Sequence, residues 1–311
     1  MNSANPGLQQ RLGQAAAAVL EGLDQGGKWQ PLAGLDSDSA VWEVEGRIVK
    51  ARRLSPFRAG MLKTALSDIH AALAPAGLTP RLLSITYHDD ILVSEFERID
   101  ATGPAHPGEI GFALGCCHRL LAAVSIRSTV AWTGFYGEFQ EFRFLVPLVT
   151  DNSLRERATR LLPAARYREH TEPVHYIHRD LNPMNVLKGA RGVRILDWEM
   201  AYGGHREDDV AMAICCLADS SVAGSEEGIA TEFLAGYRIS LPAPWATLSH
   251  PLLRSAIALA GLRQAVAGWF TDEGDTSASY WPNIRKRLET ACQLSDLMGN
   301  GNSKDPLGIG W

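Results

Sequence analysis

One short stretch constrains this chain more than any other: HRDLNPMN at residues 178–185, with DWE at residues 197–199 beginning twelve positions after the last asparagine. The segments between the two motifs, residues 186–187 and 193–196, are apolar except for Arg194 and rich in β-branched side chains. Glycines at both ends of the short stretch between them supply a turn. We therefore expect a β-hairpin that brings the two motifs together.

The residue types in these motifs suit phosphoryl transfer. Asn185 and Asp197 offer amide and carboxylate oxygens, which are hard ligands for a Mg²⁺ ion that keeps waters and phosphate oxygens in its shell. Asp180 lies five residues before Asn185 and could accept the proton of an attacking hydroxyl. A base, a metal-binding amide and a metal-binding carboxylate are the parts that this chemistry requires.

The pattern H-x-D-x-x-x-x-N followed by D-x-E resembles the superfamily of aminoglycoside phosphotransferases, choline kinases and thiamine kinases, which has the protein-kinase-like fold. The resemblance implies that Asp180 positions or deprotonates the acceptor hydroxyl and that Asn185 and Asp197 bind magnesium. It gives His178 a structural role in the loop. Asp209 resembles a family aspartate that opens the next helix, and an ordinary charge at a helix N-terminus is the alternative.

The N-terminal part of the chain provides an independent check, because the family places a lysine on the third strand, in reach of the α and β phosphates of the nucleotide. Lys50 ends the strand-like run at residues 47–50, and only 6 of the 30 basic residues are lysines. The loop at residues 33–40 corresponds to the one that covers the nucleotide. It has a single glycine, but its backbone amides and the hydroxyls of Ser37 and Ser39 could cradle phosphate.

The helix expected over residues 61–74 departs from the family, in which a glutamate of this helix usually pairs with the lysine. The predicted helix contains no glutamate, and Asp68 is its only acidic residue. Two interpretations stay open for Asp68: a shorter partner for Lys50, or a surface charge. In the second case Lys50 remains the phosphate ligand but is less well positioned.

The apolar run ILVSEFE at residues 91–97 matches the segment that links the two lobes in such folds. In those folds, the adenine ring forms hydrogen bonds with backbone groups of this segment. By position, these groups belong to Glu95, Phe96 and Glu97. Side-chain identity does not diagnose this contact, so the assignment rests on position alone.

The pattern of apolar residues changes along the chain in a way that predicts two lobes. The first hundred residues predict a small, mostly antiparallel sheet, with a hairpin that turns at Glu45-Gly46 and one inserted helix. From about residue 107 the chain reads as helical, with late helices predicted at 207–218, 225–239, 251–270 and 281–298. The expected fold is α+β and bilobal, protein-kinase-like, with a β-rich N-lobe (1–98) and a mainly helical C-lobe (99–311).

The acceptor is the least determined part of the prediction. The DWE form resembles the choline and thiamine kinase side of the superfamily, and Glu199 either pairs with a cationic substrate or braces its loop. Aromatic side chains near carboxylates suit an amine or a quaternary ammonium group, although packing in the core is the alternative for all of them. The aromatic candidates are Trp198, Tyr202, Trp269 and Trp281.

Three functional hypotheses follow. The leading one is an ATP- and Mg²⁺-dependent kinase that phosphorylates a hydroxyl of a small molecule: a cationic amino alcohol, thiamine, an aminosugar or an aminoglycoside. A non-catalytic nucleotide-binding module is favoured by the sparse glycine loop and the missing helix glutamate. A protein kinase is suggested by the HRD form. DWE in place of DFG, the absence of G-x-G-x-x-G before Lys50 and the absence of A-P-E argue against it.

Composition limits the partners and the compartment. A formal charge of -5, from 30 basic and 35 acidic residues, argues against binding nucleic acid. No apolar run approaches the roughly 18 residues of a membrane span, and the N-terminus lacks a signal-peptide pattern. Five cysteines, an odd number without C-x-x-C, predict free thiols in a reducing compartment. We expect a soluble cytoplasmic protein whose partners are ATP and a small-molecule acceptor, with its oligomeric state open.

Overall fold

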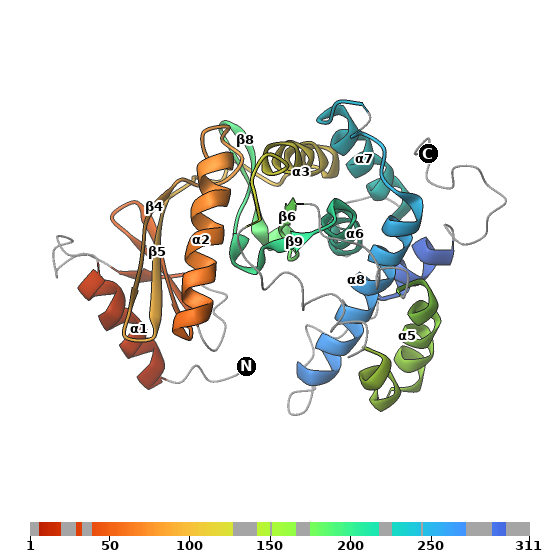
Figure 1. The fold of residues 1–311 in the computed structure, drawn as a ribbon, viewed down its shortest axis with the longest axis horizontal. Coiled ribbons are helices and arrows are strands. Elements are labelled where there is room, and N and C mark those ends of the chain that lie inside the picture. Colours follow the sequence, from red (N-terminus) through yellow and green to blue (C-terminus); the bar gives the residue numbers. More distant parts are fainter. Residues whose placement is uncertain are drawn as a thin grey trace.

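The fold was determined as a computed structural model of the chain (Figure 1). The structure describes residues 6–19, 29–32, 39–126, 142–149, 151–165, 175–217, 226–243, 245–271 and 288–296. The strands are β1 (Gln30–Pro31), β2 (Ser39–Val44), β3 (Arg47–Arg53), β4 (Leu82–His88), β5 (Ile91–Glu97), β6 (His175–Ile177), β7 (Val186–Gly189), β8 (Gly192–Ile195) and β9 (Tyr202–Gly204). The helices are α1 (Pro6–Val19), α2 (Pro56–Leu73), α3 (Pro107–Leu121), α5 (Asn152–Ala165), α6 (Arg206–Leu217), α7 (Glu226–Ile239) and α8 (His250–Thr271). Short 3-10 turns occur at Val146–Leu148, Pro183–Asn185 and Trp198–Met200, and residues 288–296 are helical.

The N-terminal part contains an antiparallel sheet of five strands in the order β1-β2-β3-β5-β4. Its central hairpin turns at Glu45 and Gly46, both at positive φ (49° and 75°), which is the geometry that a tight two-residue turn requires. Helices α1 and α2 lie on opposite sides of the sheet (Figure 1). The α1 side forms a small core of its own, which includes Leu12, Trp42 and Val49.

Helix α2 connects this sheet to the rest of the molecule. It begins at Pro56, five residues before the predicted start, because Ser55 caps it through a hydrogen bond to the amide of Arg58 and proline suits the first helical turn. The side chains of Leu66, Ile69 and Leu73 are buried in the main hydrophobic core together with residues of the C-terminal helices. The helix is therefore anchored to both parts of the protein.

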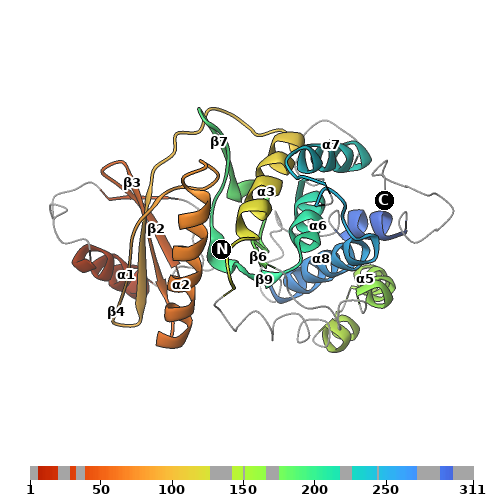
Figure 2. The same cartoon turned by 45° about the horizontal axis from the view of Figure 1, so that its top comes forward.

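The C-terminal part is mainly helical. In Figure 2, α3 lies between the β7–β8 hairpin and the helices α6 and α7. α3 and α7 approach closely because glycines face the contact: a Cβ added to Gly111 would lie 2.0 Å from the carbonyl oxygen of Phe233, and one on Gly236 would lie 1.9 Å from that of Gly108. Helices α5 and α8 complete this part.

Two short pairs of strands position the sequence motifs. The predicted hairpin is β7–β8, in which Val186 pairs with Ile195. Strand β6, which leads into residues 178–185, pairs with β9, which follows residues 197–199, so that Ile177 lies opposite Tyr202. The two motifs are therefore held next to each other at both ends.

The architecture confirms the predicted fold class, with a sheet in the N-terminal region and helices in the C-terminal region. Helix α5 and strand β9 were not predicted. Across the described ranges of the chain, we find no helix that is long and apolar enough to cross a lipid bilayer.

Candidate functional site

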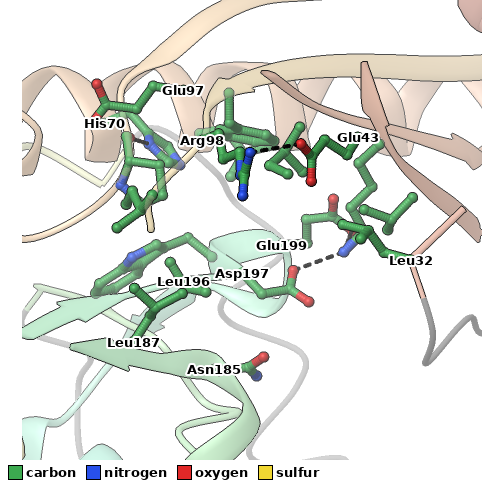
Figure 3. Close-up of a pocket in the computed structure, with 18 residues that line it drawn as sticks. Leu32, Glu43, His70, Glu97, Arg98, Asn185, Leu187, Leu196, Asp197 and Glu199 are labelled. Atoms are coloured by element: carbon green, nitrogen blue, oxygen red, sulfur yellow. Dashed lines mark hydrogen bonds and ion pairs between the residues drawn. The ribbon is translucent and has the colours of Figure 1, made fainter. Parts of the chain in front are cut away.

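A cavity of about 400 Å³ lies between the sheet and the β7–β8 hairpin (Figure 3). Strands β2 and β3 contribute Val41 and Ile48 to it, and the hairpin contributes Leu187. Its lining also includes the charged and polar residues Glu43, Lys50, Arg98, Asn185, Asp197 and Glu199. The cavity thus combines an apolar part with a cluster of charges.

The loop at residues 178–185 brings the expected base, Asp180, and the expected metal ligand Asn185 together. The side-chain amide of Asn185 donates to the backbone carbonyl of Asp180 at 2.8 Å and to its carboxylate at 3.1 Å. Asn182 donates to the same carboxylate at 3.1 Å. Because the amide nitrogen of Asn185 faces Asp180, its oxygen is directed away from that carboxylate. Asp180 itself is not among the residues that line the cavity, and it lies directly beyond Asn185.

Asp209 supports the loop at residues 178–185 through its backbone. Its carboxylate, fully buried on α6, accepts hydrogen bonds from the backbone amides of His178 and Arg179, both at 2.6 Å. Arg179 has a φ of +70°, which side chains with a Cβ rarely adopt. His118 contacts the same carboxylate at 3.0 Å and the hydroxyl of Tyr237 at 2.8 Å. Burial alone would raise the pKa of Asp209, but these hydrogen bonds and the charge of His118 lower it.

Asp209 therefore acts on the loop backbone, which resolves the alternatives that the sequence left open. An ordinary charge at the start of a helix would be exposed to solvent. His178, expected to be structural, donates from its ring Nε2 to the carbonyl of Leu196 at 2.6 Å and so connects the two motifs. His118 and Tyr237 had no signal in the sequence beyond being polar residues within apolar helices.

Lys50 reaches across the cavity from β3 to the DWE motif. Its ammonium lies 2.9 Å from Asp197 and 3.1 Å from Glu199. Burial opposes the charge on Lys50, but the two carboxylates outweigh it and raise the pKa of the lysine. Asp197 has a φ of +57°, in the left-handed region that aspartate tolerates better than most residues. The ion pair joins the expected phosphate ligand to the expected metal ligand.

The pairing of Lys50 with Asp68 that we considered is not what the structure contains. Within the described part of the chain, both ion pairs of Lys50 are made with the DWE motif. Glu199 lies two residues after the expected metal ligand Asp197, in a 3-10 turn that packs against α2, and its carboxylate reaches Lys50 from there.

Glu199 is a buried residue next to Lys50. Its side chain is 6% exposed and lies 3.1 Å from both Lys50 and Arg52. Burial raises the pKa of its carboxyl group, Lys50 lowers it, and Asp197 raises it further, with a net increase. Of the two roles expected for Glu199, contact with a cationic acceptor or support of its loop, these contacts favour the second.

The residues expected to contact adenine lie at the end of strand β5, which ends at Glu97. Glu95 is inside β5, between β3 and β4, and its side chain pairs with Arg47 and Ser84 rather than lining the cavity. Phe96 and Glu97 do line it, but the amide of Glu97 donates to the carbonyl of Arg81. The cavity wall continues through Arg98 and Ile99.

Arg98 also spans the cavity. Its guanidinium lies 2.8 Å from the carboxylate of Glu43 on β2, and Figure 3 shows this pair above the charged cluster. The amide of Ile99 makes no backbone hydrogen bond with any residue that the structure describes. The edge of a ligand in the cavity could therefore form a hydrogen bond with this amide.

The aromatic residues considered for the acceptor are only partly described. Trp198 is 1% exposed, donates from its indole to the carbonyl of Ile195 and packs edge-on against His178, so it is a core residue at the wall of the cavity. Tyr202 is buried under the guanidinium of Arg179, 4.7 Å from the ring centre. Ser39 is buried at the start of β2 and is not among the cavity residues. Ser37, Trp281 and the side chain of Trp269 lie outside the described residues.

Comparisons with known proteins agree with this geometry. A sequence model described as the phosphotransferase enzyme family matches residues 28–248. Three solved structures share the fold over most of both chains. Amicoumacin kinase hAmiN, in complex with AMP-PNP, Ca²⁺ and Ami, is 13% identical with a TM-score of 0.64, over 92% of this chain and 93% of the other.

The second structure is a choline/ethanolamine kinase family protein from Mesorhizobium loti, 14% identical with a TM-score of 0.63, over 97% of this chain and 98% of the other. The third is a microcompartment-associated aminopropanol kinase, 16% identical with a TM-score of 0.63, over 96% and 99%. Among curated protein sequences, no match was found. At these identities the likeness shows the fold, while the sequence match spans more than two thirds of the chain and confirms the predicted superfamily. The chain belongs to the phosphotransferase enzyme family.

Proposed function

We propose that the protein is an ATP- and Mg²⁺-dependent kinase that transfers the γ-phosphate of ATP to a hydroxyl group of a small molecule. The observation that carries this proposal is the cavity between the two parts of the fold. Lys50, Asn185 and Asp197 converge at its charged side, and Asp180 is hydrogen-bonded to Asn185 just beyond it.

The apolar side of the cavity fits a nucleotide base. Val41 and Ile48 of the sheet and Leu187 and Leu196 of the opposite wall offer aliphatic surfaces to the two faces of a flat ring. The backbone around Ile99 could bond its edge, and its phosphates would then extend toward Lys50. In this proposal the adenine contact lies near Ile99, beside Phe96 and Glu97, which also line the cavity.

The donor set fits a magnesium ion that arrives with the nucleotide. Asn185 and Asp197 offer one amide and one carboxylate oxygen, and no group of three or more His, Cys, Asp or Glu side chains suited to a metal occurs among the described residues. Such a pair needs phosphate and water oxygens to complete six-fold coordination, as Mg²⁺ prefers. Once bound, the ion would neutralise charge on the phosphates.

The chain's own residues would carry the transfer. Lys50 would orient the phosphates, and Asn182 and Asn185 hold the carboxylate of Asp180 by hydrogen bonds. The acceptor oxygen attacks the γ-phosphorus while the bond between that phosphorus and the bridging oxygen breaks and ADP leaves. The proton of the acceptor hydroxyl passes to Asp180.

Two of the relatives and the charge of the chain support an amino alcohol as the acceptor. One solved structure of this fold is described as a choline/ethanolamine kinase family protein and another as an aminopropanol kinase, and these three compounds are amino alcohols. A net charge of -5 is compatible with a cationic acceptor. We therefore place a hydroxylated amine first, ahead of thiamine and aminoglycosides. The five cysteines are buried free thiols, which supports a cytoplasmic location.

The test is ATP turnover with Mg²⁺ against a panel of amino alcohols, thiamine, aminosugars and aminoglycosides, with the phosphorylated product identified by mass spectrometry. Asp180→Asn should lower kcat by about 10²- to 10⁴-fold, while the affinity for AMP-PNP changes by less than about twofold. EDTA should abolish turnover. Full activity of Asp180→Asn would contradict the mechanism. Nucleotide binding without any product would indicate a binding module, and labelled protein without a labelled small molecule would indicate a protein kinase.

A further inference from the structure

The carboxylate that holds Lys50 comes from an unusual place in this chain. Helix α2 contains no glutamate. The lysine ammonium instead lies 3.1 Å from Glu199, two residues after the expected metal ligand Asp197. Glu199 is the most deeply buried of these charged side chains, since it is 6% exposed while Asp197 is 38% exposed.

A second cation shares this carboxylate. Arg52 lies two residues after Lys50 on β3, so both side chains leave the same face of the strand. The guanidinium of Arg52 is 3.1 Å from the Oε2 atom of Glu199, the same oxygen that Lys50 contacts. Arg52 does not line the cavity, so it is not placed to touch a nucleotide. Its neighbour Arg53 leaves the opposite face and pairs with Asp90 at 2.8 Å.

The charges around Glu199 balance only when Arg52 is included. Lys50 and Arg52 face two carboxylates, Asp197 and Glu199. When Asp197 turns to a metal ion and the ammonium of Lys50 turns to phosphate oxygens, Glu199 would be left buried with its charge uncompensated. Removing one partner of a buried ion pair is strongly unfavourable, so the second cation keeps the carboxylate in place.

We infer that Glu199 and Arg52 are a pair of positioning residues for Lys50, and that they replace the helix glutamate by which this family usually fixes its lysine. The inference rests on the proposed function and adds to it the residues that align the phosphate ligand. One consequence concerns α2. Because the lysine anchor belongs to the same turn as the expected metal ligand, the carboxylate that meets Lys50 is not carried by α2, although α2 packs against that turn. This differs from protein kinases, in which the lysine pairs with a helix that moves.

The first experiment compares Arg52→Gln with the matched control Arg53→Gln on the adjacent residue. Arg52→Gln should lower kcat/KM for ATP about tenfold, the loss expected when a charged hydrogen bond goes. KM for the acceptor should change by less than about twofold. Arg52→Lys should restore most of the loss, and Arg53→Gln should behave as the parent. Equal losses on the ATP and acceptor sides, or no difference between the two glutamine variants, would overturn the inference.

The second experiment asks whether Arg52 acts through the lysine. Binding of AMP-PNP with Mg²⁺ is measured for Lys50→Met, Arg52→Gln and the double variant. If Arg52 positions Lys50, its replacement should weaken binding in the parent but add less than about twofold once Lys50 is gone. Independent, additive losses would contradict this. Glu199→Gln should match Arg52→Gln. If Asp68→Asn reproduced that loss instead, the anchor would lie on α2 and the inference would be wrong.

These measurements separate the inference from the proposed function. Absence of a phosphorylated product from the parent enzyme across the acceptor panel would overturn the proposed function. The binding cycle would still decide the role of Arg52, because it needs the nucleotide alone. Conversely, an active parent whose Arg52→Gln variant binds AMP-PNP as well as the parent would overturn only the inference.

Discussion

At the scale of single residues, the carboxylate of Asp209 holds the loop that carries Asp180. It satisfies two backbone amides next to a residue at φ +70°. A non-glycine residue in this region is strained and persists only when its surroundings fix it. Asp209 thus maintains the backbone conformation from which the expected base projects.

Replacing Asp209 by alanine should therefore affect both stability and activity. The change leaves two buried amides without their acceptor and His118 without its carboxylate, so we expect the free energy of unfolding to fall by about 4 kcal/mol. Activity should fall further than the folded fraction accounts for, because the loop loses its support. Urea unfolding and steady-state turnover measure the two effects. Tyr237→Phe removes only the hydroxyl that contacts His118. It should lower the free energy of unfolding by about 1 kcal/mol and leave the turnover rate unchanged. Equal effects of the two variants would count against this interpretation.

Three of the expected site residues lie close together because their spacing in the sequence is short, and their roles stay predictions. Asp180, Asn185 and Asp197 lie in two motifs separated by one hairpin, so local structure brings them together. Glu199 and Asp68 were harder to assign, because their side chains could reach the same lysine from different elements. Only the position of the 3-10 turn against α2 decides between them.

At the scale of elements, the contact between α3 and α7 depends on missing side chains. A Cβ on Gly111 would lie 2.0 Å from a backbone oxygen of α7, and one on Gly115 would lie 1.8 Å from the hydroxyl of Ser240. Backbone atoms cannot move aside as a flexible side chain can. Because α3 also carries His118, this contact sets the distance from α3 to Asp209 and Tyr237.

Gly111→Ala should accordingly destabilise the protein by about 3 kcal/mol, at the upper end of the range for overpacking. Gly60→Ala is the matched control, since a Cβ there meets nothing within 4 Å although the residue is also helical. It should stabilise the protein by up to about 1 kcal/mol, because alanine favours helix more than glycine does. Thermal unfolding of the two variants checks whether the first is destabilised and the second is stabilised. A neutral Gly111→Ala would mean that α3 and α7 can separate freely.

Elements with strong local signals were predictable and those without were not. The β2–β3 hairpin and the β7–β8 hairpin were expected with their turns, because glycine and alternating apolar residues mark both. Helix α5 contains Pro163, which weakens the pattern of a helix. Strand β9 has three residues, two of them glycines, and exists through its pairing with β6.

At the scale of the whole molecule, two buried histidines connect the folded state to pH. Burial lowers the pKa of His70 to about 4, against a hydrogen bond to the carbonyl of Pro80 that raises it. Burial and the nearby His118 lower the pKa of His175 to about 3. His70 lies on α2 and His175 on β6, so one histidine belongs to each part of the fold.

The protein should lose stability on acidification below about pH 6.5. Both histidines are neutral in the folded state there, whereas the unfolded chain takes up a proton at each, so stability falls as pH decreases. Each should contribute a slope of about 1.4 kcal/mol per pH unit until its folded pKa is reached. Urea unfolding between pH 7 and pH 5 measures the slope. His175→Leu should remove about half of the histidine contribution, and an unchanged slope in that variant would contradict the assignment.

The bilobal arrangement itself was predictable, because the change from strands to helices along the sequence is abrupt. The exact path of the linking segment was not. β5 continues to Glu97, and the cavity wall then runs through Arg98 and Ile99. The end of a strand depends on its neighbours in the sheet, here the bond from the amide of Glu97 to Arg81.

The ion pair between Arg98 and Glu43 has a kinetic consequence. It joins the linking segment to β2 across the cavity, at 2.8 Å, and both side chains are partly exposed to solvent. Both residues line the cavity, so we expect a ligand that enters or leaves it to pass this pair. Dissolved ions screen exposed pairs within about 10 Å at 0.1 M, so the pair should open more often as the salt concentration rises. We therefore expect the residence time of a ligand in the cavity to depend partly on the ionic strength around the protein.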